Sequence, residues 1–432
     1  MTKTQPLISV VMPSFNQVNF IDAAIGSIWE QDYEQWEVLV IDGGSTDGTV
    51  QRLEAWSLML GSRLRWVSEK DSGPANAINK ALDLASGEVI GWLNSDDIYA
   101  PGAVSAAARH FLANPDAMMV YGEAEHIDEE GGSLGRYPTQ PPSATIQSFQ
   151  DGCFICQPTV FLRRKVFDDV GYLDETLVTA FDFELWLRIF RRFPDNINQI
   201  ERVQAYSRLH AECITHKLRR FVAIEGISIL AKHVGQPKPH WILTYLDELY
   251  VTYPFEGDIA SLETHVAQLF EQIKHCFDED TLNELACKVF KDARLQIALP
   301  GVFATVYSDG WAPPNLEIRI KKLPESSSAI TLQCDHLTLA FRPLSLRITT
   351  SWGWECRVIV KKPGEFEIMI DLLGIPTKDN LVISIESETN FIPRNLDPAS
   401  SDSRQLSFKV YKLQLESTGS RLDDRLQNNG AI

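Results

Sequence analysis

Short apolar runs alternate with segments of helical spacing in the first part of the chain. The runs are rich in β-branched residues and end in polar loops, as buried strands do; they cover 7–12, 37–41, 64–67 and 89–93. Between them, apolar residues recur three and four positions apart, as in Ile21, Ala24, Ile25, Ile28 and Trp29 and again in Ile78, Ala81, Leu82 and Ala85. Strands that alternate with helices predict an α/β fold with a mostly parallel sheet and helices on both faces.

Polar side chains follow these predicted strands, at the edge where such sheets bind ligands. Carboxylates are prominent among them, namely Asp42, Asp47, Glu69, Asp71, Asp96 and Asp97. Phosphate-binding glycine loops of the GxGxxG and GxxxxGK[ST] types do not accompany them. Carboxylates that share a pocket repel one another unless a cation joins them. A hard divalent metal, Mg²⁺ or Mn²⁺, is therefore the economical explanation.

The pattern changes in the second half of the chain. From about 236 to 299 it is helical, and after Pro300 apolar and polar residues alternate. The alternating apolar positions are Leu316, Ile318 and Ile320; Phe366, Ile368, Ile370 and Leu372; Leu381, Ile383 and Ile385; and Leu406, Phe408 and Val410. Several such strands predict a β-sandwich behind a helical connector. Three tryptophans in this region belong either to its core or to platforms on which sugars stack; they are Trp311, Trp352 and Trp354.

Composition narrows the class of protein. The 432 residues suffice for about two to four domains at roughly 100–200 residues each. A net charge of −18 argues against nucleic acid as a partner. The seven cysteines, an odd number scattered over a long chain, indicate free thiols in a reducing compartment. Because the first residues lack the apolar core of a signal peptide and no stretch approaches the ~18 apolar residues of a membrane span, we expect a cytoplasmic protein.

Several segments of the first half form an ordered set of motifs. They are SVVMPSFNQ (Ser9–Gln17), IDGGSTDGT (Ile41–Thr49), SEKDSGPANAINKAL (Ser68–Leu82), GEVIGWLNSDDIYAPGAV (Gly87–Val104), CQPTVFLRRKVFDDVGYLDETL (Cys156–Leu177) and FDFELWLRI (Phe181–Ile189). In this order they resemble the motifs of family 2 glycosyltransferases, which have the Rossmann-like GT-A fold. The resemblance covers roughly residues 6–235. With the patterns above, it predicts a GT-A domain at 1–235, a helical connector at 236–299, a β-sandwich at 300–416 and a disordered tail at 417–432.

The resemblance implies a nucleotide-sugar site at the ends of the predicted strands. It gives Asp42 a hydrogen bond from the nucleotide base and places Asp71 in the same pocket. The family often has Asp-Asp where this chain has Asp42-Gly43, so one carboxylate is missing. Turn chemistry is the alternative for Asp42. The other positions that the resemblance assigns to the nucleotide sugar are Pro13, Asn79, Asn94, Ser95 and Asp96.

The resemblance also implies a metal site in the stretch Asn94-Ser95-Asp96-Asp97. Asn94 replaces the first carboxylate of the family's Asp-x-Asp pattern, so Asp96 becomes the leading ligand. Asp97 is either a second ligand or a residue that ties down the next loop through backbone hydrogen bonds. His210 matches a family position near the diphosphate, where an imidazole joins the metal shell or donates to a phosphate; a structural histidine is the alternative.

Asp182 is the position that the resemblance assigns to the catalytic base, with Glu184 next in line. The family commonly has Glu-Asp where this chain has Phe181-Asp182, which leaves Asp182 as the matching carboxylate. Asp182 opens a helix, so an N-cap is the alternative. A helix N-terminus would lower the pKa of this carboxyl group, whereas neighbouring carboxylates and a diphosphate would raise it.

Together these positions imply a metal-dependent, inverting glycosyltransferase, which moves a sugar from a nucleotide diphosphate sugar to an acceptor hydroxyl. The acceptor expected is a growing surface glycan, with a lipid-linked form, peripheral membrane association and a homodimer as further options. One alternative is a nucleotidyltransferase, but the loop that starts at Pro13 is not the glycine-rich, basic loop that such an enzyme needs. The other is a catalytically inactive sugar-binding or scaffold protein, which would have no need of Asp42, Asp96 and Asp182 together.

Overall fold

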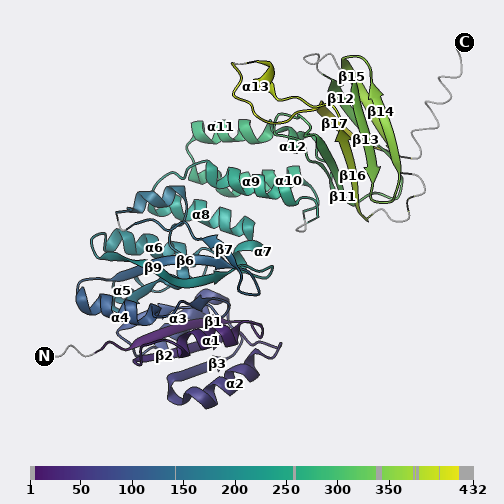
Figure 1. Cartoon of the computed structure of the whole chain (residues 1–432). Coiled ribbons are helices and arrows are strands. Elements are labelled where there is room, and N and C mark those ends of the chain that lie inside the picture. The colour runs from purple at the N-terminus through teal and green to yellow at the C-terminus, as the bar shows by residue number, and fades with distance from the viewer. Residues whose placement is uncertain are drawn as a thin grey trace, which may run out of the picture. The chain divides into compact units, whose positions relative to one another are not determined.

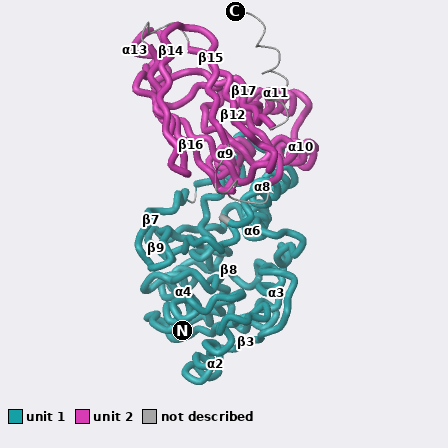
Figure 2. The backbone as a smooth tube through the Cα atoms, turned by 90° about the vertical axis from the view of Figure 1, so that its right-hand side faces the viewer, with its two compact units in different colours: residues 1–241 teal, residues 242–432 magenta. Residues whose placement is uncertain are grey.

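The computed structural model describes residues 5–141, 143–255, 259–336, 343–372, 375, 379–397 and 399–417 (Figure 1). The chain divides into two compact units, residues 1–241 and 242–432 (Figure 2). The first unit contains two clusters of buried apolar residues, and the second contains another. Within the described ranges, no helix is both long enough and apolar enough to cross a membrane.

A mixed sheet, nine-stranded over the described residues, forms the centre of the first unit. Its strands are β1 (Ile8–Ser14), β2 (Trp36–Asp42), β3 (Leu64–Ser68), β4 (Val89–Trp92), β5 (Ile98–Tyr99), β6 (Met119–Ile127), β7 (Ser133–Arg136), β8 (Phe161–Arg163) and β9 (Ile197–Arg208). Their order is β3-β2-β1-β4-β8-β6-β9-β5, with β7 paired to β6 beside this path. β1 pairs in parallel with β2 and β4, and β2 with β3, whereas β8 is antiparallel to β4. The predicted α/β fold is confirmed.

Helices cover both faces of this sheet (Figure 1). They are α1 (Ile21–Trp29), α2 (Thr49–Leu60), α3 (Pro74–Leu84), α4 (Ala103–Ala113), α5 (Lys165–Val170), α6 (Phe181–Arg192), α7 (Ile214–Lys217) and α8 (Arg219–His233), with the 3₁₀ turns η1 (Gly61–Arg63), η2 (Ile146–Asp151) and η3 (Gln157–Thr159). Successive side chains of a strand point to opposite faces. In β1, Val11 therefore packs with α3 and α6, whereas Val10 and Met12 pack with α1 and α4.

The parallel arrangement decides where the polar loops meet. Because β1, β2, β3 and β4 run in the same direction, the loops that follow them lie at one edge of the sheet. The start of α6 reaches the same edge, since Trp92 at the end of β4 stacks on Phe181 with ring centroids 6.0 Å apart. Trp186 of α6 also contacts Trp92, at 6.2 Å. One edge therefore gathers the candidate loops and the first turn of α6.

The second unit begins with helices, although the first residues of α9 still belong to the first unit. They are α9 (His240–Thr252), α10 (Leu262–Ile273), the 3₁₀ turn η4 (Lys274–Cys276), α11 (Glu279–Phe290) and α12 (Ala293–Ile297). The helical pattern predicted here is confirmed most clearly in α10, where the whole predicted apolar stripe is buried: Leu262, Val266, Leu269, Phe270 and Ile273.

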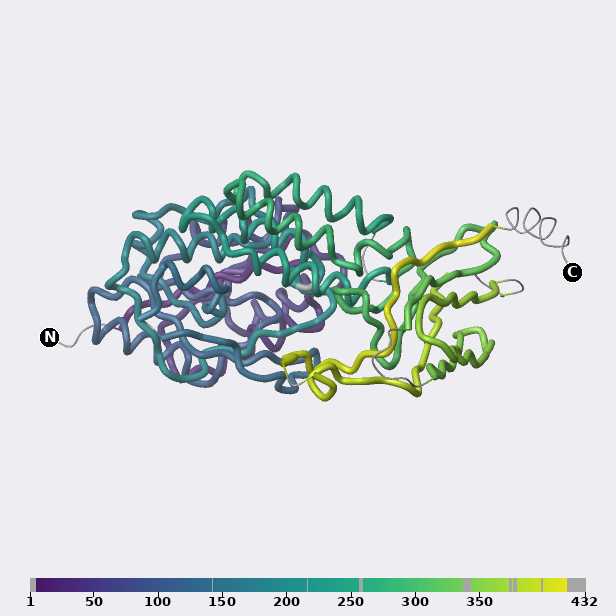
Figure 3. The backbone as a smooth tube through the Cα atoms, turned by 90° about the horizontal axis from the view of Figure 1, so that it is seen from above, coloured from purple at the N-terminus to yellow at the C-terminus, as the bar shows by residue number. Residues whose placement is uncertain are grey.

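Two antiparallel sheets with a common core make up the rest of the second unit. Their strands are β10 (Val302–Ala304), β11 (Asn315–Lys322), β12 (Ser327–His336), β13 (Leu344–Thr350), β14 (Glu355–Val360), β15 (Gly364–Asp371), β16 (Asp379–Ser387) and β17 (Lys409–Ser417), with the short helix α13 (Pro393–Leu396) before β17. One sheet has the order β10-β11-β16-β13-β14 and the other β15-β12-β17. β17, the yellow strand that ends the described chain in Figure 3, returns to pair with β12. The predicted β-sandwich is confirmed.

The tryptophans of this unit mostly pack against other side chains rather than form platforms for sugars. Trp352 and Trp354 lie against the shared core of the two sheets. Trp311 meets Phe391 edge-on, with ring centroids 5.3 Å apart. These contacts correspond to the core alternative in the sequence analysis. Of the tail predicted to be disordered, residues 418–432 lie outside the described residues.

Candidate active site

The loop after β4 carries an aspartate paired with a histidine. The Oδ2 atom of Asp96 lies 3.1 Å from Nε2 of His210, which follows β9. His210 is buried, and its ring packs against Phe20 from the loop after β1, with centroids 4.9 Å apart. The fold thus brings together two residues that the sequence analysis assigned to one metal site, although 114 positions separate them.

The neighbouring Asp97 is buried and bound to the chain. Its Oδ1 atom accepts a hydrogen bond from the backbone N–H of Arg208 at 2.9 Å, and the side-chain amide of Asn94 donates to Oδ2 at 3.4 Å. Burial, and then the charge of Asp96, raise the pKa of Asp97 well above its ordinary value. These bonds match the second of the two predicted roles for Asp97, a residue that ties the loop in place.

Asp96 and His210 form a pair that fits a divalent metal. Adjacent ligands of an octahedral Mg²⁺, each about 2.1 Å from the ion, are roughly 3.0 Å apart, close to the 3.1 Å between the two side chains. Carboxylate oxygens suit Mg²⁺ and Mn²⁺, and neutral imidazole is a common metal ligand. Over the part of the chain that the structure describes, no three His, Cys, Asp or Glu side chains gather closely enough to hold an ion. The metal stays a prediction.

A second group surrounds Gly43 at the end of β2. A Cβ atom at this glycine would lie 3.1 Å from Oδ2 of Asp71 and 3.3 Å from Cδ2 of Phe15. The other oxygen of Asp71, Oδ1, accepts a hydrogen bond from Gly73 N at 2.9 Å. Phe15 follows β1 directly and is 59% exposed. Since a Cβ at Gly43 would already be tight against both groups, the glycine lets an exposed aromatic ring and a carboxylate come close together. Side by side, they offer a stacking surface and a hydrogen-bond acceptor to a flat ligand.

Asp42 has a different environment from the one that the resemblance implies. Its carboxylate is fully buried and accepts four hydrogen bonds from the chain itself. Oδ2 accepts from Gly44 N (3.1 Å), Ser45 N (2.9 Å) and Ser68 Oγ (2.6 Å), and Oδ1 accepts from Ser45 Oγ (2.5 Å). Asp42 therefore holds the loop after β2 against β3, and its contact with a nucleotide base stays a prediction.

The remaining predicted nucleotide-sugar residues near this edge are largely built into the fold. Pro13 is a buried residue of β1, paired with Ile41 of β2. Ser95 directly precedes Asp96 and is buried, with 3% of its surface exposed. Asn94 accepts a hydrogen bond from the indole N–H of Trp92 at 3.1 Å. A role for these three residues at the nucleotide sugar stays a prediction.

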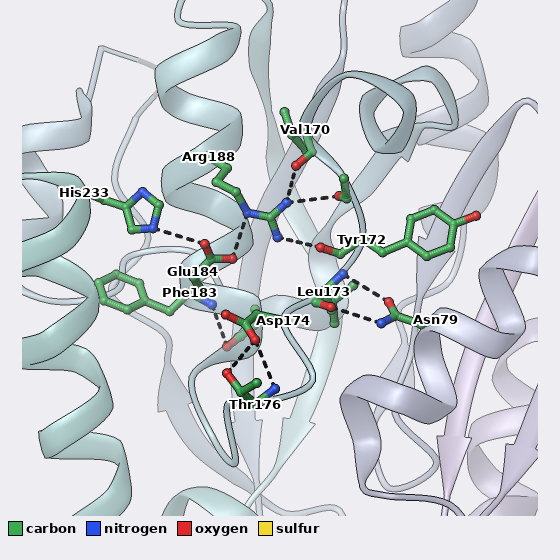
Figure 4. A network of polar contacts seen from close by, with 12 residues as sticks. Asn79, Val170, Tyr172, Leu173, Asp174, Thr176, Phe183, Glu184, Arg188 and His233 are labelled. Atoms are coloured by element: carbon green, nitrogen blue, oxygen red, sulfur yellow. Dashed lines mark hydrogen bonds and ion pairs between the residues drawn. The ribbon is translucent and has the colours of Figure 1, made fainter.

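Asn79 lies in α3 and clamps the loop after α5 (Figure 4). Its amide donates to the backbone oxygen of Leu173 and its Oδ1 accepts from the backbone N–H of Leu173, both at 3.0 Å. Arg188 of α6 grips the same loop, because its guanidinium donates to the backbone oxygens of Val170 (2.5 Å) and Tyr172 (2.8 Å). The side chain of Asn79 is thus occupied inside the protein, which gives this residue a structural task that the resemblance does not imply.

Asp182 lies in the first turn of α6 and is not the residue at the N-cap. That position is Ala180, and no side chain of the cap residue bonds the helix. Asp182 is partly exposed, and its Oδ1 accepts a hydrogen bond from the N–H of Phe183 at 2.7 Å. Burial raises the pKa of Asp182 to about 6, against the backbone hydrogen bonds of Phe183 and of Asp182 itself, which lower it. Burial is thus what raises this pKa, and it was not among the opposing effects considered from the sequence.

Buried thiol and phenol groups lie close to Asp182. Burial, followed by the charge of Asp182, raises the pKa of Cys153 to about 12. Burial also raises the pKa of Tyr137, whose hydroxyl donates to the backbone oxygen of Cys153 at 2.7 Å. Cys156 lies near both Asp97 and Asp182, because burial and then the charges of these two residues raise the pKa of its thiol. The loop after β4 and the start of α6 therefore belong to one site.

Glu184, the alternative base, is paired instead with two basic side chains (Figure 4). It is 3% exposed, and its two oxygens lie 2.8 Å from Nε of Arg188 and 3.1 Å from Nε2 of His233 in α8. Burial would raise the pKa of Glu184, but the hydrogen bonds and charges of His233 and Arg188 outweigh it and lower the pKa. A carboxylate so bound is poorly placed to accept a further proton.

Three residues of this edge escaped the sequence analysis. Phe15 carries a weak signal, an aromatic residue directly after a predicted strand. Arg208 is buried and donates from Nε to the backbone oxygen of Asp96 at 2.9 Å, and its guanidinium lies over the ring of Phe20. Glu225 of α8 bonds the turn before α6. Arg208 and Glu225 contact residues that are distant in sequence, so no local sequence pattern could predict these contacts.

A family model and two relatives with known names all indicate the same family. The sequence model described as "Glycosyl transferase family 2" matches residues 9–171. An uncharacterized glycosyltransferase of Rickettsia conorii is 32% identical over 315 residues, which cover 68% of this chain and 47% of that protein. The Escherichia coli protein named UDP-Glc:alpha-D-GlcNAc-diphosphoundecaprenol beta-1,3-glucosyltransferase WfgD is 33% identical over 195 residues, which cover 45% of this chain and 73% of WfgD.

A solved structure shares the fold over nearly the whole chain. The crystal structure of Staphylococcus aureus TarS aligns with a TM-score of 0.50 and 14% identity, covering 96% of this chain and 86% of that one. At this identity the likeness concerns the fold. The chain spans between 35% and 66% of the length of the five Rickettsia relatives that it matches, about half on average.

Proposed function

This chain belongs to glycosyltransferase family 2, and from that premise we propose that it transfers one sugar from a nucleotide diphosphate sugar to an acceptor hydroxyl, with inversion at the anomeric carbon. Inversion requires the acceptor oxygen to attack from the face opposite the leaving diphosphate while a base removes its proton. A single displacement of this kind needs one carboxylate at the acceptor and no covalent intermediate. The residues that would carry it lie at the edge of the sheet formed by β1 to β4.

One observation carries the proposal, the state of Asp182. A general base works best when its pKa lies near the operating pH, and burial raises the pKa of Asp182 to about 6. The side chain remains partly exposed and therefore within reach of an acceptor. We assign to Asp182 the role of the base that removes the proton of the acceptor hydroxyl.

Asp96 and His210 would hold Mg²⁺ or Mn²⁺. Their 3.1 Å separation suits two neighbouring ligands of one ion. When bound, the ion would neutralise charge that develops on the leaving diphosphate. We leave Asp97 out of this ligand set because its Oδ1 atom accepts the N–H of Arg208 and its pKa is raised by burial.

The nucleotide base would lie against Phe15 and Asp71, which come together beside Gly43. An aromatic ring stacks on a base, and a carboxylate accepts its imino or amino hydrogen. Asp42 would act behind them by holding the loop after β2, since its oxygens already accept four hydrogen bonds from the chain.

The acceptor that we propose is a growing glycan carried on a lipid, in surface polysaccharide assembly. The name of the relative WfgD pairs a UDP-sugar donor with a diphosphoundecaprenol-linked acceptor, and this supports the proposal. A lipid-linked acceptor would bring the enzyme to the cytoplasmic face of a membrane as a peripheral protein.

The test is a screen of UDP-, GDP- and dTDP-sugars for release of the nucleoside diphosphate, with and without Mn²⁺. We expect one donor class to be hydrolysed in the presence of the metal, and Asp96→Ala to abolish metal-dependent turnover while the protein stays folded. Asp116→Asn is the control, because Asp116 is an exposed carboxylate between α4 and β6. Pyrophosphate release would point to a nucleotidyltransferase, nucleotide binding without turnover would point to a scaffold, and an unchanged Asp96→Ala rate would remove Asp96 from the site.

A further inference from the structure

The turn that precedes α6 takes its hydrogen bonds from another helix. The carboxylate of Glu225 in α8 accepts the N–H of Val178 at 2.7 Å through Oε1. Through Oε2 it accepts the N–H of Thr179 (2.8 Å), the hydroxyl of Thr179 (2.7 Å) and the N–H of Ala180 (2.9 Å). Glu225 stands 45 to 47 positions later in the chain than its partners, so this is a tertiary contact and not local turn chemistry.

This contact fixes the backbone that leads into Asp182. The N–H groups at the start of a helix need acceptors, and acidic side chains nearby usually supply them. Glu225 supplies the acceptor for the N-cap residue Ala180 and for the two residues before it, and a carboxylate at this end is also favoured by the helix dipole. Asp182, two residues after Ala180, takes its hydrogen bonds within the described residues from backbone N–H groups of its own turn.

We propose that Glu225 is a positioning residue for sugar transfer: by bonding residues 178–180 it fixes the start of α6 and with it the place at which the carboxylate of Asp182 meets the acceptor. The inference rests on the proposed function, in which Asp182 is the base. Glu225 itself does not touch the reacting atoms, because its oxygens are occupied by the turn.

A merely structural staple between α8 and α6 is the competing explanation, and the fold allows the two to be separated. α8 is joined to α6 a second time, where His233 lies 3.1 Å from Glu184. It is also packed tightly beside Glu225, since a Cβ at Gly226 would come within 2.8 Å of the ring of Trp241. A change at Glu225 should therefore leave α8 docked while it releases the turn.

The experiment uses Glu225→Gln in the full chain. Glutamine has the same size and keeps one oxygen acceptor, but in either orientation its NH₂ group faces at least one of the backbone N–H donors that Glu225 accepts. With Mn²⁺ and whichever of UDP-, GDP- and dTDP-glucose the wild type hydrolyses fastest, we expect kcat per folded enzyme to fall about 10-fold or more and KM for the nucleotide sugar to change less than about 2-fold. Glu225→Asp, which keeps the charge on a shorter side chain, should recover part of kcat.

Hydrogen exchange supplies a readout that does not depend on activity. Amides within 178–180 should exchange faster in Glu225→Gln than in the wild type, because at least one of them loses its acceptor and meets the NH₂ group instead. Ser228→Ala is the matched control on α8, since the Ser228 hydroxyl donates to Ile224 of the same helix; its exchange and kcat should match the wild type.

The outcomes are distinguishable. A normal kcat in Glu225→Gln, with faster exchange or without it, overturns the positioning role while wild-type turnover leaves the proposed function standing. A kcat and KM that change together also overturn it, because a disturbed donor site would then explain the loss. If the wild type hydrolyses no nucleotide sugar, the proposed function fails and the positioning role fails with it.

Discussion

Replacing Asp182 with asparagine should slow the enzyme and stabilise it at neutral pH. Asparagine keeps the size of the side chain and can still accept the N–H of Phe183, but it cannot take a proton. If Asp182 is the base, turnover should fall by roughly 10²–10⁴-fold. Nucleotide affinity should barely change, because the residues assigned to the nucleotide base and to the metal lie in other loops.

The stability effect follows from the raised pKa of Asp182. The carboxyl group has a pKa of about 6 in the folded protein and an ordinary value of 3.8, so the folded state binds this proton more tightly than the unfolded chain. The wild type therefore loses stability as the pH rises from about 4 to about 6, and the loss is complete above that range. A difference of about two units corresponds to roughly 3 kcal/mol, which we reduce to about 1–3 kcal/mol because the side chain is partly exposed. Asparagine lacks this loss.

The assay compares denaturant midpoints of the wild type, Asp182→Asn and Asp116→Asn between pH 4 and pH 8, together with single-turnover rates. We expect Asp182→Asn to exceed the wild type in stability at pH 8 and to approach it near pH 4, while Asp116→Asn follows the wild type throughout. A folded Asp182→Asn protein with near-normal turnover would refute the assignment of the base. A stability difference that does not depend on pH would refute the argument from burial.

Three further substitutions test the other assignments. Gly43→Val puts a branched side chain against Asp71 and Phe15, which a Cβ alone would already approach to 3.1 and 3.3 Å, and should weaken nucleotide binding at least 10-fold, measured by calorimetry, with Gly43→Ala as the smaller control that loses less. Asn79→Ala removes both hydrogen bonds to Leu173 and should lower the free energy of unfolding by about 2–4 kcal/mol with unchanged nucleotide affinity; a lost affinity would restore Asn79 to the donor site. Trp241→Ala should lower the free energy of unfolding by about 2–4 kcal/mol without changing the nucleotide affinity, because this ring stacks on Phe183 at 5.7 Å.

The fold was predictable where burial and periodicity agree. β1, β2 and β4 are buried over their whole length and read as continuous apolar runs, and the alternation around Ile318 follows a sheet with one buried face. β8 has three residues, too few to show a period. β12 buries Ser327 and Ser328 among its apolar residues, so its composition conceals a buried strand. Such segments become strands through their neighbours in the sheet, which a local pattern does not contain.

The place of the candidate site was also predictable, because the ends of parallel strands meet at one edge. The state of each carboxylate was not. Asp42 and Asp96 both follow buried strands in polar loops, yet Asp42 accepts a hydrogen bond from Ser68, 26 positions away, and Asp96 meets His210, 114 positions away. The partners of each residue depend on which loops the sheet order brings together.

The hydrogen bonds divide the acidic side chains of this edge into two kinds. Asp42 and Glu225 each accept four hydrogen bonds from the chain, and Glu184 is held by two basic side chains. The oxygens of Asp42 and Glu225 are largely taken up by these bonds and have little capacity left for a ligand. Asp182 accepts backbone N–H groups of its own turn, among the described residues, and burial raises its pKa, which lowers stability at neutral pH but suits a general base. The heavily bonded carboxylates hold the edge together, so the search for a base should begin with the partly exposed carboxylate whose pKa burial raises.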